Sequence, residues 1–293
     1  MNAQKTNHIA MGVIYLLCAI VLMILVGLIG YIIVTGLPYV NWTFLTTPAD
    51  SMGMGGGIRD QLFNSLYLLV LTLIISVPLS LGAGIYLAEY APKNAVTKVI
   101  RSAIEVLSSL PSIVIGLFGY LFFVVKMGMG FSVLAGAIAL TFFNIPLLTR
   151  NCESALEEVS ADHRAGGLAL GLSRWKTVTK IMLPEAIPGV LTGIILSAGR
   201  IFGEAAALIY TSGQSVPAVS YANWNPLSAD SFLNPMRPAE TLAVHIWKLN
   251  TEGLVTNAHQ ISSGASAVLV IVVLLFNVGA RLTGRALKKR LGQ

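Results

Sequence analysis

Two oppositely charged residues stand inside an apolar stretch of the sequence, SAGRIFGEAAALIY at residues 197–210. Arg200 and Glu204 are four residues apart, and residues at that spacing lie on one face of a continuous helix, where they can form an ion pair. A charge at the centre of a lipid bilayer costs at least about 2.5 kcal/mol, so such an Arg must face other protein groups or water. The planar guanidinium of Arg can also bind two oxygens of a phosphate or carboxylate group at once.

Two interpretations of this pair remain open. In the structural one, Arg200 and Glu204 only neutralise each other and help two helices or two subunits pack. Gly199, Gly203 and Ala207 favour it, because small residues four apart allow helices to approach closely in a membrane. In the functional one, Arg200 lies on the path of an anion. Glu204 then either competes for Arg200, so that the anion is released, or accepts the proton of a P–OH group.

The composition places the pair in a membrane protein. Hydrophobic residues make up 55% of the chain, charged residues only 11%, and the mean hydropathy is +0.76, whereas about 25% of residues are charged in soluble domains. About 20 apolar residues suffice to cross a bilayer. Such runs occur at residues 9–34, 62–88, 106–125, 127–149, 186–210 and 264–280. We therefore predict an all-α polytopic membrane protein with six transmembrane helices.

The basic residues predict the orientation of these spans, because Lys and Arg are enriched in cytoplasmic loops. With both termini in the cytoplasm, the outer segments contain Arg59, Lys126, Arg237 and Lys248, and fourteen other Lys and Arg residues are cytoplasmic. The chain then divides into an N-terminal span with the first outer loop (residues 1–61), a core (62–288) and a cytoplasmic tail (289–293). The core contains a cytoplasmic loop at 151–186 and an outer segment at 211–260, in which residues 238–249 predict a short amphipathic surface helix; whether it re-enters the bilayer stays open.

Four prolines fall in or at the start of the predicted spans, at Pro78, Pro111, Pro146 and Pro188. Proline removes a backbone hydrogen bond and bends a helix. Kinked helices that can move against one another are therefore expected, although Pro is also simply more frequent in transmembrane helices than in soluble ones.

The cytoplasmic loop at 151–186 has a pattern of its own. Residues 153–170 predict a helix that ends at Gly171, because Gly adopts the left-handed conformation that terminates helices. Ser173 can cap a second helix, and Pro184 is expected to stop it after Leu183. A helix, a turn and a second helix between two spans are well placed to contact another protein in the cytoplasm.

This loop resembles the coupling loop of ABC importer permeases, whose pattern is Glu-Ala-Ala, three residues, Gly, nine residues and Ile-x-Leu-Pro. The chain has Gly171, Ile181, Leu183 and Pro184 at that spacing, but Ala165-Gly166-Gly167 in place of Glu-Ala-Ala. Each glycine should cost the first helix about 1 kcal/mol relative to Ala. The resemblance implies that the ATPase subunits contact a set of coupling residues: Arg164, Ala165, Gly166, Gly167, Leu168, Leu170, Gly171, Ile181, Leu183 and Pro184.

Longer stretches resemble phosphate-importer permeases of the PstA and PstC type, namely residues 64–92, 110–119 and 199–213; the chain length and six spans are more similar to PstA. The resemblance implies the ABC type I importer permease fold in the bacterial cytoplasmic (inner) membrane. It also implies a heterodimer with a PstC-type permease subunit, a PstB-type ATPase dimer that binds ATP and Mg, a PstS-type phosphate-binding protein, and inorganic phosphate as substrate.

No residue pattern predicts catalysis or a cofactor in this chain itself. His8, His163, His245 and His259 lack the spacing of metal ligands, and the stretch GMGGG at 53–57 is not followed by the Lys-Ser or Lys-Thr of a nucleotide-binding loop. We expect no nucleic-acid partner. The alternatives are a permease for another oxyanion such as sulfate or molybdate, the sister PstC-type subunit, or a proton-coupled secondary transporter, which would not need the coupling loop.

Overall fold

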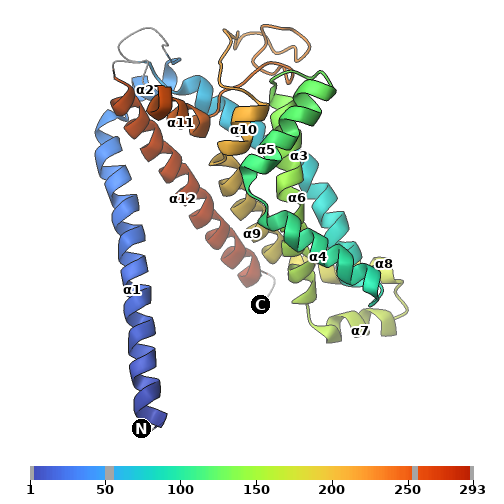
Figure 1. Cartoon of the computed structure of the whole chain (residues 1–293). Helices are drawn as coiled ribbons and strands as arrows, with labels where there is room; N and C mark the ends of the chain where they lie inside the picture. The colour runs from blue at the N-terminus through green and yellow to red at the C-terminus, as the bar shows by residue number, and fades with distance from the viewer. Residues whose placement is uncertain (1–2, 50–55, 253–256, 291–293) are drawn as a thin grey trace.

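The computed structural model describes residues 3–49, 56–252 and 257–290, and over these ranges the chain is helical, with one isolated β-bridge between Ser220 and Ser231 (Figure 1). Residues 53–55 of the predicted glycine-rich connector and 291–293 of the predicted tail lie outside them. The helices are α1 (Ala3–Gly36), α2 (Trp42–Thr46), α3 (Arg59–Ile85), α4 (Ala95–Ser109), α5 (Ser112–Gly119), α6 (Val133–Glu157), α7 (Ala161–Ala169), α8 (Arg174–Thr177), α9 (Leu183–Phe202), α10 (Ala206–Thr211), α11 (Leu242–Glu252) and α12 (Ala258–Arg290).

Four short helical segments connect or extend these helices. One is the 3-10 turn η1 (Leu37–Tyr39) after α1. The other three are π-helical turns: η2 (Tyr86–Tyr90) extends α3, η3 (Tyr120–Lys126) extends α5, and η4 (Val178–Met182) joins α8 to α9. Such turns insert an extra residue into a helix and often occur at functional sites.

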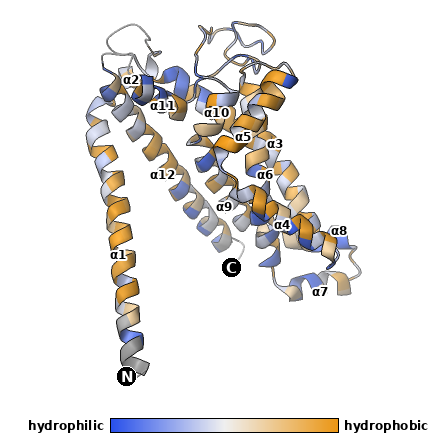
Figure 2. Ribbon diagram, in the orientation of Figure 1, coloured by the Kyte–Doolittle hydropathy of each residue, from blue (hydrophilic) through white to orange (hydrophobic). Residues whose placement is uncertain are grey.

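Five continuous helices in the described ranges are long and apolar enough to span a membrane, and they confirm five of the predicted spans. They cover Ala10–Tyr39, Arg59–Tyr90, Val133–Glu157, Arg174–Phe202 and Ala258–Leu287. Figure 2 shows that α1 is hydrophobic along most of its length, whereas α7 combines hydrophilic and hydrophobic residues.

The predicted span at 106–125 is not one helix. It consists of the end of α4 and of α5 with its π-helical extension, which meet at 94° and form either a broken sixth span or a re-entrant loop. Pro111 lacks an N–H group and disfavours helical geometry at Leu110, so the chain breaks there. The part before the break is amphipathic: Arg101 and Glu105 of α4 form ion pairs with Glu153 and Arg150 of α6.

Several spans pack together around α6. α3 and α9 lie against it, α12 packs along α9, and α1 contacts mainly α12 and the turn η1. Between α3 and α6, Asn144 Nδ2 donates a hydrogen bond to Ser76 Oγ over 3.0 Å. Hydrogen bonds of this kind hold helices together in a bilayer, where burial of apolar surface gives no net advantage over lipid.

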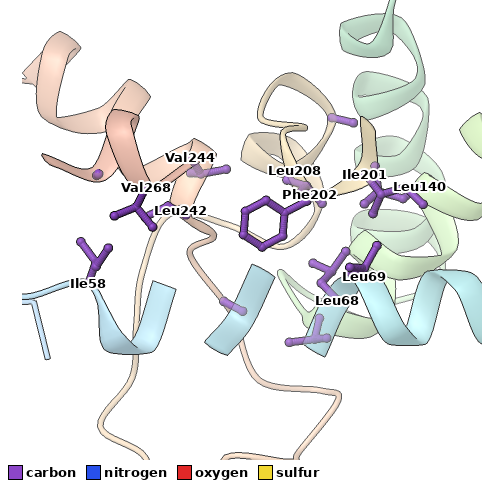
Figure 3. Close-up of a cluster of buried hydrophobic side chains, with 14 of the residues drawn as sticks. Ile58, Leu68, Leu69, Leu140, Ile201, Phe202, Leu208, Leu242, Val244 and Val268 are labelled. Atoms are coloured by element: carbon purple, nitrogen blue, oxygen red, sulfur yellow. The ribbon is translucent and has the colours of Figure 1, made fainter. Parts of the chain in front are cut away.

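The main hydrophobic cluster joins the spans near one end of the molecule. Leu68 and Leu69 of α3, Leu140 of α6 and Phe202 of α9 are buried there, together with side chains of α10, α11 and α12 (Figure 3). The ring of Phe202 packs edge-on against Phe276 of α12, with centroids 5.8 Å apart. The outermost turn of α9 is therefore fixed by packing on several sides.

The two ends of the molecule differ. In Figure 1, α7 and α8 lie at one end, and α2, α11 and the segment 212–241 lie at the other. The N-terminal end of α1 and the C-terminal end of α12 point toward the end with α7. The short helix predicted at 238–249 is α11, which begins only at Leu242 after a cap in which Thr241 Oγ1 accepts a hydrogen bond from the Val244 N–H over 3.4 Å.

Candidate functional site

Arg200 is located in the last turn of α9 and is exposed when this chain is considered alone. Its guanidinium carbon lies 4.0 Å from the centroid of the Phe143 ring, which α6 supplies and which is itself buried. A cation over an aromatic face is stabilised by the negative charge of that face. The ring thus supports the guanidinium without using its N–H donors, which stay available for an acceptor.

The prediction that Arg200 and Glu204 share one helix face is wrong, because the helix stops between them. α9 ends at Phe202 and α10 begins at Ala206. Glu204 Oε1 instead accepts a hydrogen bond from the Ala207 N–H over 3.4 Å, at the start of α10. None of the ion pairs among the described residues joins Arg200 to Glu204.

The small residues predicted to form one packing face also have different surroundings. A Cβ at Gly199 would lie 3.8 Å from atoms of α12, whereas Ala207 packs against α5, where a Cβ at Gly116 would lie 2.7 Å from the Ala207 Cα. Gly203 directly follows the last residue of α9, and its N–H still donates to the Gly199 carbonyl over 3.2 Å. Gly199 and Ala207 therefore lie at helix contacts on two sides of a broken span, whereas the atoms within 4 Å of a Cβ at Gly203 belong to its own helix, so the predicted common packing face is not formed.

The helix predicted at 153–170 is two helices. α6 continues to Glu157, and α7 begins anew at Ala161 after Ser160, whose hydroxyl accepts a hydrogen bond from the Asp162 N–H over 3.2 Å. A Ser cap satisfies a backbone donor that has no partner within the helix. Because of this new start, α7 is a separate element of nine residues that contains Arg164, Ala165, Gly166, Gly167 and Leu168.

The turn after α7 matches its prediction. Gly171 has φ +76°, and the N–H groups of Gly171 and Leu172 donate to the carbonyls of Leu168 and Gly167 over 3.0 and 3.2 Å. This pair of hydrogen bonds is the Schellman motif, in which a glycine in the left-handed conformation ends a helix. Ser173 caps α8 as predicted, accepting a hydrogen bond from the Lys176 N–H over 3.4 Å. Leu170 stands at the turn with 83% of its surface exposed.

Pro184 does not stop the second helix, contrary to the prediction. It falls in the first turn of α9, directly after η4, in which the Leu183 N–H donates to the Val178 carbonyl. A helix tolerates Pro where an N–H has no partner in any case, and the π-helical turn rearranges the bonding just before it. One helical rod therefore runs from Arg174 to Phe202 and includes Ile181, Leu183 and Arg200.

α7 is attached to its neighbours at three points. A Cβ at Gly167 would lie 2.8 Å from Ile181 Cδ1, so this glycine allows α7 to lie directly on η4. His163 Nδ1 lies 2.5 Å from Glu185 Oε2 of α9, and Arg164 forms an ion pair with Glu89 of η2. Sequence analysis did not identify Glu89 or Glu185, because their partners are distant in the sequence.

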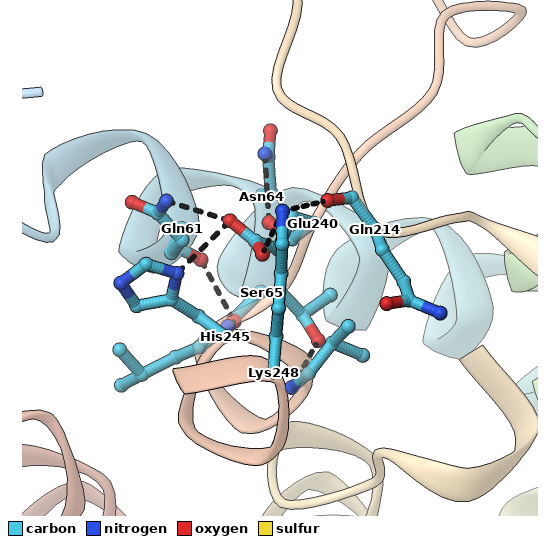
Figure 4. Close-up of polar contacts among 10 residues, drawn as sticks. Gln61, Asn64, Ser65, Gln214, Glu240, His245 and Lys248 are labelled. Carbon is cyan, nitrogen blue, oxygen red and sulfur yellow. Dashed lines mark hydrogen bonds and ion pairs between the residues drawn. The ribbon is translucent and has the colours of Figure 1, made fainter. Parts of the chain in front are cut away.

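A buried polar cluster lies at the other end of the molecule (Figure 4), and it was also not predicted. Glu240 Oε2 accepts hydrogen bonds from Gln61 Nε2 over 2.9 Å and from His245 Nδ1 over 3.0 Å, while Lys248 Nζ lies 3.7 Å from Oε1. Burial alone would raise the pKa of Glu240. The contacts with His245, Gln61 and Lys248 outweigh that effect and hold its pKa below the ordinary value of 4.5.

The same cluster fixes the segment 212–241 to α3. Asn64 Nδ2 donates to the Glu240 carbonyl over 3.0 Å, and its Oδ1 accepts from the buried Arg237 over 2.7 Å. Further along, the Tyr221 hydroxyl donates to Asp60 over 2.7 Å, and burial raises the pKa of Tyr221 to about 12. The segment has little regular structure of its own, yet side chains hold it at several points. In the part of the chain that the structure describes, no three His, Cys, Asp or Glu residues are placed to bind a metal.

Comparison with known protein families identifies the family of this chain. A model of the family described as "Binding-protein-dependent transport system inner membrane component" matches residues 80–293, which include α7, the turn at Gly171 and α9. The chain belongs to this family of ABC transporter permeases. Its members are multi-pass membrane subunits, which agrees with the five or six spans.

Two relatives and one solved structure show how far the similarity extends. The "Probable ABC transporter permease protein YqgI" of Bacillus subtilis is 52% identical over 99% of both chains. The "Phosphate transport system permease protein PstA 2" of Mycobacterium bovis is 33% identical over 90% of this chain and 82% of that protein. A chain in the crystal structure of a bacterial alginate ABC transporter with its periplasmic protein has a TM-score of 0.63 over 98% of both chains, at 12% identity. That last likeness concerns the fold alone, the ABC type I importer permease fold.

Proposed function

We propose that this permease is a PstA-type membrane subunit of an ATP-driven phosphate importer and that Arg200 binds the anion on its path across the membrane. Its partners would be a PstC-type permease, a PstB-type ATPase dimer and a PstS-type phosphate-binding protein. Similarity to permeases named as parts of phosphate transport systems, at 30 to 36% identity, supports the choice of phosphate.

One observation carries the role of Arg200. Its side chain lies on the exposed surface of α9 within a spanning rod, and no ion pair to a carboxylate is found for it among the described residues. A charge on a spanning helix must face water or another subunit instead of lipid. The spanning helix is also broken next to Arg200, and interrupted helices often form the substrate sites of transporters.

The helix α7 and the turn after it support the proposal that transport is driven by ATP. α7 presents Leu168 and Leu170 to the surrounding solution, and large apolar groups on an exposed helix end are suited to a protein partner. The rod that begins beside α7 carries Arg200 in its last turn. A displacement of α7 by the ATPase would therefore act on the anion site along one helix, giving alternating access.

We further propose an orientation for the chain in the membrane and assign ATP hydrolysis to other subunits. The end with α7 and both termini would face the bacterial cytoplasm, and the cluster around Glu240 would face outward. ATP and Mg would be bound by the ATPase subunits, so this chain would itself be non-catalytic.

The test is uptake of labelled phosphate by the reconstituted complex that contains Arg200→Gln. We expect uptake to fall at least about tenfold, because an Arg–phosphate contact is a charge-assisted hydrogen bond, while assembly and ATPase activity persist. Lys126→Gln is the matched control, since Lys126 is also a cation over an aromatic ring, 5.7 Å from the centroid of Phe122. Normal uptake with Arg200→Gln, or loss of assembly with it, would contradict the proposed role.

Glu204→Gln completes this experiment. The structure shows that Glu204 accepts a bond from the start of α10, and the proposal adds that its charge limits how tightly Arg200 holds phosphate. Glu204→Gln should then change the uptake rate or the preference for phosphate over sulfate, and an unchanged rate and preference would exclude that role. A preference of the wild-type complex for sulfate or molybdate would favour the alternative of another oxyanion.

A further inference from the structure

The start of α7 has two neighbouring residues that bind two different spans. His163 contacts α9 and Arg164 contacts the end of α3. A helix attached at a single point could pivot without moving the bundle. Attachment through adjacent residues to two helices instead means that any displacement of α7 must pull on both.

The contact to α3 is formed by a protected carboxylate. The Glu89 side chain is only 10% exposed and pairs with Arg164, whose guanidinium also donates to the Ala88 carbonyl over 3.5 Å. The Glu89 carboxylate is largely withdrawn from water while its partner Arg164 is 44% exposed, so water and salt screen this pair less than one between two fully exposed side chains. This contact is therefore suited to transmitting force.

The contact to α9 has a similar construction. The Glu185 side chain is 20% exposed, and Glu185 is located in the first turn of α9. Its partner His163 is the residue directly before Arg164. No other acidic residue of α9 is available for this contact, because the rest of its length lacks Asp and Glu.

Both carboxylates lie in or beside a π-helical turn. Glu89 is part of η2, and Glu185 follows η4 within the same rod. Such turns are places where a helix can change its local register or direction. Force applied through the two carboxylates therefore reaches the positions at which α3 and α9 can bend or rotate.

The two spans lead to the two sides of the proposed anion site. α9 carries Arg200 itself, and α3 packs along α6, which carries the Phe143 ring beneath Arg200. Moving α9 relative to α6 would change how the guanidinium sits on that ring. The contact with Glu185 acts on α9 and the contact with Glu89 acts on the end of α3, so a rotation of α7 would displace the two spans by different amounts.

We propose that Glu89 and Glu185 are positioning residues that convert the displacement of α7 into relative motion of α3 and α9 at Arg200. This inference rests on the proposed transport function and assigns its mechanical connection. It predicts that loss of either contact, Arg164–Glu89 or His163–Glu185, separates ATP hydrolysis from transport and leaves the anion site itself intact.

The test is the number of labelled phosphate ions imported per ATP hydrolysed by the reconstituted complex. We compare Glu89→Gln, Arg164→Gln and the double variant, and we expect each to lower this ratio at least about fivefold, the lower end of typical coupling between sites. All three variants remove the same ion pair. The number of phosphate ions imported per ATP should therefore fall no further in the double variant than in either single variant. His163→Gln and Glu185→Gln form a second set with the same expectation.

Glu158→Gln is the matched control, because Glu158 is an exposed carboxylate near α7 for which no ion pair is found among the described residues. It should leave the ratio unchanged. The double variant Glu89→Gln/Arg164→Gln leaves no unpaired charge, so it remains informative if a single variant fails to assemble. A wild-type ratio in the double variant, or losses that simply multiply between the single variants, would overturn the inference.

The outcome can be separated from the choice of substrate. If the wild-type complex imports sulfate or molybdate and not phosphate, the proposed substrate is wrong, and the same ratio measured with that anion still tests Glu89 and Glu185. If phosphate is imported and the ratio is insensitive to both pairs, the substrate stands and the mechanical assignment fails.

Discussion

The two glycines at the centre of α7 have different surroundings. A Cβ at Gly166 would meet no atom within 4 Å, whereas a Cβ at Gly167 would lie 2.8 Å from Ile181 Cδ1 and 2.9 Å from Thr177 Cγ2. Gly167 thus permits the close contact between α7 and η4. Gly166 makes no such contact and only lowers the stability of the helix.

This difference predicts opposite effects of the same substitution. Gly166→Ala should stabilise α7 by up to about 1 kcal/mol, the difference in helix propensity between the two residues. Gly167→Ala should displace α7 from Ile181 and thereby lower the stability of α7. Hydrogen exchange of the α7 amides measures both, with protection rising about fivefold in the first variant and falling in the second. Equal changes in the two variants would contradict the packing described for Gly167.

At this scale the sequence predicts what is local and misses what is distant. The left-handed turn at Gly171 and the cap at Ser173 follow from residue type alone, and both are confirmed. The pairing of Arg200 with Glu204 assumed an unbroken helix and is wrong. The partner of Glu240, Gln61, is 179 residues away in the sequence, so no local pattern could indicate that this carboxylate is buried.

Among the elements, the segment 212–241 is attached to α3 and α11 in part through one buried carboxylate, Glu240. Glu240 connects α3 to α11 through Gln61 and His245, and these contacts lower its pKa. A carboxylate with a lowered pKa stabilises the folded state fully above its ordinary pKa of 4.5 and loses that contribution as the pH falls further. Acid should therefore loosen this attachment before it affects the apolar spans.

The corresponding prediction concerns the amides of α11. Between pH 6 and about pH 3, their hydrogen-exchange protection, corrected for the intrinsic exchange rate, should decrease, because Glu240 becomes protonated below its ordinary range. In Glu240→Gln the same pH change should have little further effect. A decrease of equal size in both proteins would show that another group controls the attachment.

Two prolines explain why some elements were predicted and others were not. Hydropathy identifies apolar runs, and it located five continuous spans. It cannot show whether Pro111 ends a helix or whether Pro184 is absorbed into one. The first follows the amphipathic helix α4 and breaks the chain, while the second follows a π-helical turn and lies in the first turn of α9. The difference depends on the hydrogen bonds just before each proline.

The two ends of the molecule have different kinds of contact. At one end, ion pairs join α7 to α3 and α9, and at the other a buried polar cluster holds the segment 212–241 (Figures 1 and 4). The proposed anion site at Arg200 lies between them on α9. Composition and basic-residue bias predict a membrane protein and its orientation, but the broken span beside Arg200 depends on packing by α5, α10 and α12.

The central claim is ATP-driven import of phosphate, and it is tested most directly by transport into vesicles that contain the wild-type complex. We would measure uptake of labelled phosphate, sulfate and molybdate with ATP present and the proton gradient dissipated. The account predicts ATP-dependent uptake of phosphate in preference to the other anions. Preferred uptake of sulfate or molybdate, or phosphate uptake that stops when the proton gradient is removed, would contradict it.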